Sequence, residues 1–143
     1  MDRRSARAVA IVAVAIVQLS CSGTTEPLHT DVNLARAAWL GAHLQAYRFE
    51  FASASSWFPK SGYYSVQVSN GQVVAASDSA GGAAPDFTLT VDTIWDRLLS
   101  ARARGELNSA LFNGRGVPIE TDMGSWPVDG GVHYWVRNFA EIR

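Results

Sequence analysis

The dipeptide Asn70–Gly71 constrains the fold most strongly, because it separates two stretches with the pattern of strands. Residues 63–69 alternate apolar and polar side chains before it, and the apolar-rich residues 72–76 follow it. Asn-Gly favours a type I′ turn, which needs positive φ at both positions and joins antiparallel strands. The predicted register places two pairs of side chains opposite each other: Val68 with Val73, and Val66 with Ala75.

The rest of the chain predicts two helices and four more strands. Period-two alternation indicates strands at residues 47–52, 106–113, 117–122 and 132–139. A helix is predicted from a cap at Thr30 or Asp31 to about residue 44, and a second from near Thr90 to Gly105. The predicted apolar face of the first carries Leu34, Ala37, Ala38, Leu40, Gly41 and Leu44, with Trp39 elsewhere. The corresponding face of the second carries Val91, Ile94, Trp95, Leu98 and Ala101.

This order of elements, αβββαβββ, predicts an α+β fold. One apolar face on each helix and alternation along each strand are satisfied together by a two-layer sandwich. We therefore expect an antiparallel sheet of about six strands with both helices on one face. Residues 31–143 form this single domain, and a monomer is expected.

The first twenty residues have the pattern of a signal peptide. Arg3, Arg4 and Arg7 precede the apolar run of residues 8–17, which is too short to span a bilayer. The following Gln18-Leu19-Ser20-Cys21 resembles a bacterial lipobox. The resemblance implies cleavage before Cys21 and attachment of diacylglycerol to its sulfur. Residues 21–30 would then be the lipidated cysteine and a flexible tether, with His29 a solvated linker side chain.

A second interpretation of this segment stays open. The lipobox position taken by Gln18 usually carries leucine or another apolar residue, and Cys21-Ser22-Gly23 offers the small-x-small pattern of ordinary signal peptidase. Cleavage after Gly23 would give a secreted soluble protein instead of one anchored in the cell envelope and facing the periplasm or exterior. In both cases the domain has no thiol, since Cys21 is the only cysteine. A disulfide scaffold and a thiol enzyme are therefore excluded.

Charge argues against a nucleic-acid partner. The chain has 12 Lys and Arg against 13 Asp and Glu. Removal of Arg3, Arg4, Arg7 and Asp2 with the signal peptide leaves nine basic and twelve acidic residues, a net charge of −3. A nucleic-acid-binding domain shows the opposite sign on a clustered face.

A set of short motifs spread over the domain carries a family resemblance. The motifs are Trp39, Tyr47-Arg48-Phe49, residues 62–68, residues 70–74, residues 90–95, Phe112-Asn113, Gly116-Val117-Pro118, Asp129 and residues 133–139. Together they resemble a family of small exported bacterial proteins, catalogued as a domain of unknown function, many of whose members are predicted lipoproteins. Members often carry a close cysteine pair where this chain has Ser53-Ala54-Ser55-Ser56, so no redox role transfers. The resemblance implies no reaction.

The residues themselves contain no recognised catalytic motif. No glycine-flanked nucleophilic serine, phosphate loop, zinc-spaced histidine pair or dinucleotide fingerprint is found. His133 with an acid could serve a weak hydrolase, and Asp122 with Asp129 could imitate a glycosidase pair. We expect a non-enzymatic protein with no metal and no cofactor.

Large aromatic residues outside the strand pattern are the candidate binding residues. Trp57 and Phe58 fall in the loop after the first strand, and Trp126 falls in the loop before the last one. Loops on a rigid sheet often carry binding residues, and tryptophan is enriched at interface hot spots. The predicted function is a cell-envelope lipoprotein whose sheet face and aromatic loops bind a protein, peptide or wall polymer. An inhibitor or chaperone-like domain acting on an envelope hydrolase is the alternative.

Overall fold

The structure is a computed structural model, which describes residues 28–125 and 129–143. Its elements, in chain order, are α1 (Val32–Ala42), β1 (Ala46–Ser55), β2 (Tyr64–Ser69), β3 (Gln72–Ser77), α2 (Val91–Ala103), β4 (Leu107–Phe112), β5 (Pro118–Ser125) and β6 (Asp129–Glu141). The predicted order αβββαβββ is confirmed. The predictions for residues 1–20, for Cys21 and for Trp126 lie outside the described residues.

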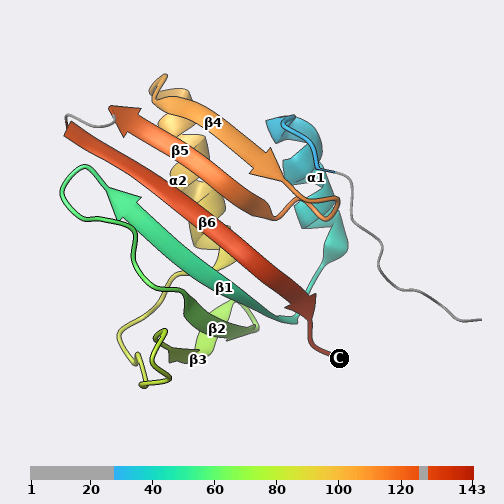
Figure 1. Ribbon diagram of the computed structural model, residues 1–143. Helices are drawn as coiled ribbons and strands as arrows, with labels where there is room; N and C mark the ends of the chain where they lie inside the picture. The colour runs from blue at the N-terminus through green and yellow to red at the C-terminus, as the bar shows by residue number, and fades with distance from the viewer. Residues whose placement is uncertain (1–27, 126–128) are drawn as a thin grey trace, which may run out of the picture.

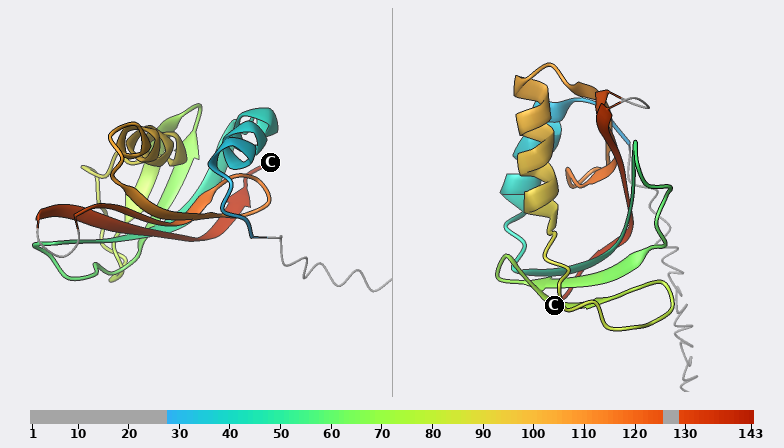
Figure 2. Two further views of the ribbon diagram at one scale, coloured as in Figure 1. Left: turned by 90° about the horizontal axis from the view of Figure 1, so that it is seen from above. Right: turned by 90° about the vertical axis from the view of Figure 1, so that its left-hand side faces the viewer.

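All six strands form one antiparallel sheet in the order β3-β2-β1-β6-β5-β4. Both helices lie on the same face of this sheet, which curves around them (Figures 1 and 2). The α+β two-layer class is therefore confirmed. The central pair joins the first and last strands of the chain. The sheet therefore has two three-stranded halves, β3-β2-β1 and β6-β5-β4, which meet at the seam between β1 and β6.

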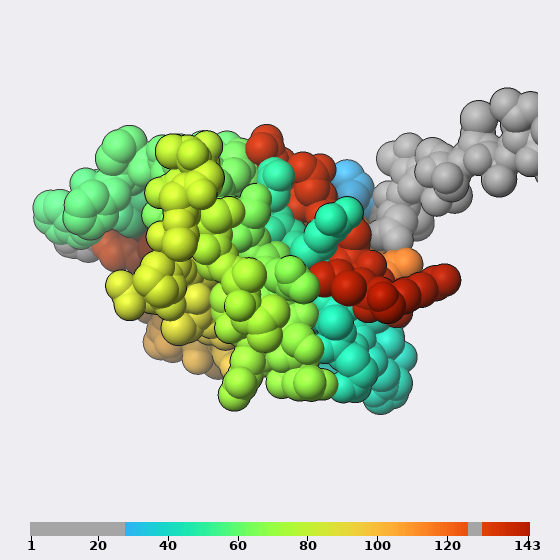
Figure 3. Space-filling model, turned by 90° about the horizontal axis from the view of Figure 1, so that it is seen from below, coloured from blue at the N-terminus to red at the C-terminus, as the bar shows by residue number. Residues whose placement is uncertain are grey.

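The β2–β3 hairpin has the predicted turn and a register that differs by one residue. The backbone φ is 50° at Asn70 and 74° at Gly71, as a type I′ turn requires. Val68 pairs with Val73 as predicted, but Val66 pairs with Ala76 and not with Ala75. A bulge between Gln67 and Val68 shifts the ladder, because an inserted residue leaves one side chain without a partner. This hairpin and the connection that follows it form the surface at one edge of the molecule (Figure 3).

The core lies between α2 and the curved face of the sheet. Five side chains of α2 are buried at helical spacing, as predicted: Val91, Ile94, Trp95, Leu98 and Ala101. Trp95 stacks on Phe112 with ring centroids 5.1 Å apart and donates its indole N–H to the carbonyl of Gly116. From β1, the alternating residues Tyr47, Phe49 and Phe51 are buried against the same cluster.

The predicted apolar face of the first helix was wrong. Ala35 and Trp39 are the residues of α1 that are buried against the rest of the domain, while Leu34 and Leu40 are 65% and 54% exposed. Of the other predicted core residues, Ala37 and Gly41 are exposed, and Ala38 and Leu44 are half-buried. This face is the one that packs inward because Trp39 buries a large ring and donates its indole N–H to Asp92 of α2 over 2.8 Å.

A glycine allows α1 to approach the β4–β5 turn closely. Gly116 has a φ of 76°, and a Cβ placed on it would overlap the carbonyl oxygen of Ala35 and lie 2.8 Å from the backbone nitrogen of Trp39. Only a residue without a side chain fits there. The inner face of α1 therefore packs backbone against backbone at this point, which a helix face lined with leucines could not do.

The domain includes His29, which was predicted to be a solvated linker residue. Its backbone N–H and carbonyl pair with those of Phe112 on β4, over 3.0 and 2.9 Å. The imidazole lies 5.8 Å from the Phe112 ring. The two hydrogen bonds attach the chain to the edge of β4 before α1 begins.

The phenol of Tyr47 supports the start of α2. Its oxygen accepts a hydrogen bond from the Val91 N–H at 3.3 Å, one of the N-terminal amides that a helix leaves without an internal partner. Thr90 and Thr93 form a capping box at the same end. Burial, together with the nearby Asp92 carboxylate, raises the pKa of Tyr47 to about 12.

Candidate functional site

The sheet face opposite the helices is left open, and polar and aromatic side chains line its centre. Alternation along β6 places His133, Trp135 and Arg137 on this face, since the neighbouring Tyr134 and Val136 are buried in the core. Ala52 and Ala54 of β1 pair with Trp135 and His133. These two alanines are nearly buried although no helix covers them, because the larger side chains beside them shield their methyl groups.

One half of this face is a stack built on β5 and β6. The Nε2 atom of His133 lies 2.9 Å from a Glu120 carboxylate oxygen, which accepts a hydrogen bond from it in the tautomer that carries its proton on Nε2. Its imidazole stacks on the indole of Trp135, with centroids 4.1 Å apart and planes 15° apart. Cross-strand pairing of Glu120 with Trp135 positions the acid, so the sheet register itself assembles the group.

The other half continues the stack through the β1–β2 loop. The Lys60 ammonium lies 4.2 Å from the centroid of Trp135 and 5.1 Å from that of Tyr63. The Arg137 guanidinium lies 3.6 Å from the Tyr63 centroid and donates from Nε to Glu50 at 2.5 Å. The seven side chains are therefore consecutive neighbours in the order Glu120, His133, Trp135, Lys60, Tyr63, Arg137, Glu50, which we name the open-face ladder.

The contacts within the ladder hold its groups in place without a bound partner. Each cation lies over an aromatic ring, an arrangement worth about 0.5–1 kcal/mol at an exposed site. The hydrogen bond from Arg137, opposed by some burial, holds the pKa of Glu50 below its usual value. Lys60 and Arg137 and the two carboxylates lie among the three rings at the centre of the face. The ladder can therefore offer a partner hydrogen-bond donors, hydrogen-bond acceptors and ring edges together.

The candidate residues Trp57 and Phe58 lie at the tip of the β1–β2 loop and are 72% and 73% exposed. The backbone beneath them is ordered, since the Ser55 hydroxyl accepts from the N–H groups of both residues at 3.3 and 3.2 Å. A further hydrogen bond joins the Ser55 N–H to the Phe58 carbonyl. The same loop carries Lys60, so the two exposed rings lie close in the chain to the ladder.

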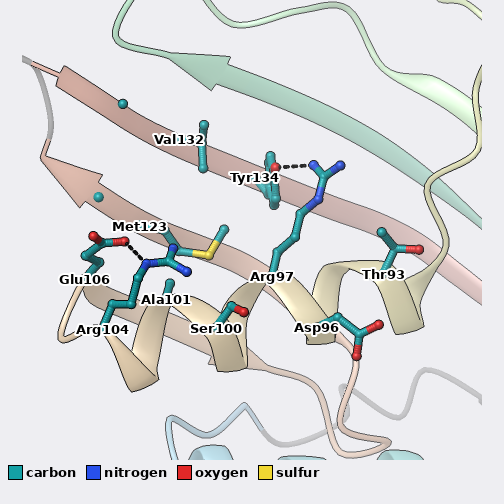
Figure 4. A pocket seen from close by; sticks show the side chains of 12 residues that line it. Thr93, Asp96, Arg97, Ser100, Ala101, Arg104, Glu106, Met123, Val132 and Tyr134 are labelled. Atoms are coloured by element: carbon teal, nitrogen blue, oxygen red, sulfur yellow. Dashed lines mark hydrogen bonds and ion pairs between the residues drawn. The ribbon is translucent and has the colours of Figure 1, made fainter.

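A separate cleft lies on the helix side, between α2 and the ends of β5 and β6 (Figure 4). Its volume is about 460 Å³. Arg97 reaches across it and donates to the Tyr134 hydroxyl at 2.6 Å, while Arg104 pairs with Glu106 at 2.8 Å. Arg97 and Tyr134 also line a second cavity of about 350 Å³ beneath the β1–β2 loop. The hydrogen bond between Arg97 and Tyr134 connects α2 to the sheet across the cleft, so these two side chains stabilise the fold.

Two kinds of feature are absent from the described residues. Between residues 28 and 125 and from 129 onwards, no three acidic, histidine or cysteine side chains gather in a way that could hold a metal ion. In the same part of the chain, no helix has the length and apolar character needed to cross a bilayer. The hydrolase candidate His133 is engaged with Glu120 and Trp135, and His43 ends α1 as an exposed residue in the left-handed conformation.

Comparison with known proteins adds no relative: no family model, curated protein or solved structure matches this chain. The family resemblance stated above stays a prediction. Sequence analysis named Trp57, Phe58 and His133 but missed Lys60, Tyr63, Arg137 and Glu50 as partners. The outward positions of β1 and β6, combined with the long-range pairing of those strands, could have found Glu50 and Arg137. Lys60 and Tyr63 lie in the β1–β2 loop, where strand alternation does not place their side chains.

Proposed function

We propose that this protein is a non-enzymatic lipoprotein of the cell envelope that binds a protein partner through its open sheet face. The open-face ladder is the single observation that carries the proposal. It places Trp135, Tyr63 and Arg137 in a connected group on a surface that no element of the described chain covers. Tryptophan, tyrosine and arginine are the residues most enriched at energetic hot spots of protein interfaces.

The chemistry of the ladder favours a protein over a highly charged polymer. Its two carboxylates offset the charges of Lys60 and Arg137, so the face has no strong single sign to attract a polyanion. Its rings are stacked on neighbours and present edges, while Trp57 and Phe58 add freely exposed apolar area at the border. A central polar and aromatic group beside an apolar anchor is a usual composition of a protein-binding surface.

Attachment to the membrane is the second part of the proposal and rests on the lipobox-like sequence that ends in Cys21. Intact-mass analysis of protein purified from its native membranes tests it. We expect an N-terminal Cys21 carrying a diacylglycerol group. A free N-terminus at Thr24 would show cleavage by ordinary signal peptidase and a secreted soluble protein.

In-cell photo-cross-linking tests the binding surface. A photoreactive amino acid in place of Trp57 should capture a defined protein, whereas the same group in place of Ser100, on the exposed side of α2, should not. Capture from both positions, or from Ser100 alone, would contradict a site on the open face. Recovery of wall polymer instead of protein would reject the protein partner.

A matched set of variants measures the contribution of the loop. Trp57→Ala with Phe58→Ala should lower the cross-linking yield from a probe at Tyr63, while Val74→Ala, which removes another exposed apolar side chain on β3, should leave it unchanged. Thermal unfolding should shift little in both cases, since all three side chains are more than half exposed. A large loss of stability in the loop variant would mark the rings as part of the fold.

The alternative of an inhibitor is separated by the identity and behaviour of the captured partner. If the partner is an envelope hydrolase, the protein should reduce its activity at a one-to-one ratio, and Arg137→Ala should weaken the effect.

The hypothesis that this protein is itself a weak hydrolase is tested by His133→Ala. It is rejected if no turnover in a panel of ester, amide and glycoside substrates depends on His133.

A further inference from the structure

Helix α1 has an apolar outer face that no other part of the described structure covers. Leu34 and Leu40 are 65% and 54% exposed, and Ala37 and Gly41 between them are also exposed. The only polar side chain on this side is Asn33, whose amide oxygen accepts from Arg102 of α2 at 2.9 Å. The inner side buries Ala35 and Trp39 and directs the Arg36 guanidinium over the Trp95 ring of α2, 5.3 Å from its centroid.

The outer face of α1 is unusual for a surface helix. Surface helices normally carry charged or polar residues on the side away from the core. Helix α2, which lies on the same sheet face, follows that rule: Asp96, Arg97 and Ser100 are exposed. The outer face of α1 therefore differs from its neighbour in a way that solvent exposure alone does not explain.

The position of α1 in the chain indicates what covers this face. Leu28 is the first described residue and is 55% exposed, and His29 is fixed to β4 just before α1. Six residues separate Cys21 from Leu28. Even fully extended, that stretch reaches at most about 25 Å. If Cys21 carries a lipid, as proposed above, a bilayer surface lies within that distance of Leu28.

We propose that the outer face of α1, with Leu28, rests on the bilayer that holds the lipid anchor. The inference rests on the proposed anchoring and adds the orientation of the domain. Because the inner face of α1 packs on the sheet, its outer face points away from the sheet. Figure 2 shows both helices on one side of the sheet, and alternation along β6 with the buried Tyr134 and Val136 places the open-face ladder on the other side. Docking by α1 therefore turns the ladder away from the membrane, toward partners in the surrounding compartment.

The size and surroundings of the face favour a bilayer over a second protein copy. An 11-residue helix offers a strip about 16 Å long and 10 Å wide, far below the roughly 800 Å² per partner of a stable interface. Partial insertion of leucines into the boundary between headgroups and acyl chains needs no such area. Arg102 of α2 donates to Asn33 at the start of this strip, where its exposed guanidinium can face polar headgroups.

Site-specific fluorescence on the acylated protein in vesicles tests the orientation. Since Cys21 is the only cysteine and its sulfur is bonded to lipid, an introduced cysteine is the only free thiol. We would label Leu40→Cys and Leu34→Cys with an environment-sensitive fluorophore, and use Val74→Cys as the control. Val74 is an apolar residue of β3 with a similar exposed fraction, 57% against 54% for Leu40. A Trp57→Cys variant reports on the opposite side of the molecule.

The expected result is that labels on α1 are quenched by a lipid-borne quencher and protected from iodide. Labels at Val74 and Trp57 should show the reverse. If the protein floats with the vesicles but Leu40 and Val74 are equally accessible to iodide, docking is wrong while anchoring stands. Protection of Leu40 from both quenchers would indicate a second copy of the chain and overturn docking. Failure to float would overturn the anchoring itself and the orientation with it.

Discussion

The two helices cover the same sheet face, yet they use their apolar residues in opposite ways. Helix α2 buries five side chains and exposes charged groups, whereas α1 buries only Ala35 and Trp39 and exposes leucines. In α2, only one face is apolar, so hydrophobic period and burial agree. In α1, the face that carries Leu34 and Leu40 is the one left outside. Periodicity identifies an apolar face but does not say whether protein or lipid covers it.

The largest expected effect is the difference in stability between a leucine-to-alanine substitution in α2 and one in α1. Leu98→Ala in α2 removes a fully buried side chain and should lower the free energy of unfolding by about 2–5 kcal/mol. Leu34→Ala in α1 should change it by less than about 0.5 kcal/mol, because Leu34 is mostly exposed. Urea denaturation followed by tryptophan fluorescence measures both. Equal losses would mean that α1 is covered by protein.

The contact of α1 with the β4–β5 turn gives the next effect. Gly116→Ala should cost about 2–4 kcal/mol, from strain at positive φ and from overlap with the α1 backbone. Gly71→Ala is the matched control, since its φ is 74° and a Cβ there meets open space. It should cost about 1 kcal/mol from strain alone. A similar loss in both variants would show that close approach at Gly116 does not hold α1.

A titration then measures the effect of burying the Tyr47 phenol at the start of α2, beside the Asp92 carboxylate. The pKa of Tyr47, raised to about 12, keeps the phenol neutral in the folded state, whereas the unfolded side chain ionises near pH 10. The contribution is therefore complete below pH 10 and is lost as the pH rises from 10 to 12. The loss should be about 2–3 kcal/mol at the upper end of this window. Urea midpoints of the wild type and Tyr47→Phe should converge over that range, and a constant difference would argue against this ionisation.

The smallest effect is expected where α1 meets no protein. Leu34→Ser with Leu40→Ser should leave thermal stability in detergent-free buffer within about 0.5 kcal/mol of the wild type. The same pair should reduce protection of a label at Ala37 in vesicles. Together, the two measurements distinguish an outer face of α1 that contacts lipid from one that contacts only solvent.

Local chemistry predicted the parts of this fold that depend on neighbouring residues. The Asn70–Gly71 turn needs positive φ at two positions, and α2 has a single apolar face with a cap and a glycine stop, so both followed from short stretches of sequence. The bulge at Gln67 and Val68 could not be predicted, because it depends on how the hairpin packs. The inner face of α1 likewise depended on Gly116 and Asp92, which lie far along the chain.

The candidate site was predicted only in part for the same reason. Trp57 and Phe58 stood out because they interrupt the strand pattern. The ladder requires β1 and β6 to be neighbours, which brings Glu50 beside Arg137 across 87 positions of sequence. Periodicity placed the side chains of each strand on one of two faces, but it carried no information about which strands would lie together.

The seam between β1 and β6 also determines when this domain can fold. In a chain that emerges with its N-terminus first, the β4–β5 pair cannot join β1–β3 until residues 129–141 arrive, since β6 pairs with β1 on one side and β5 on the other. Sheets that depend on such distant pairings form slowly. Until β6 arrives, the edges of β1 and β5 that it will pair with stay open, which exposes them to pairing with the wrong strand.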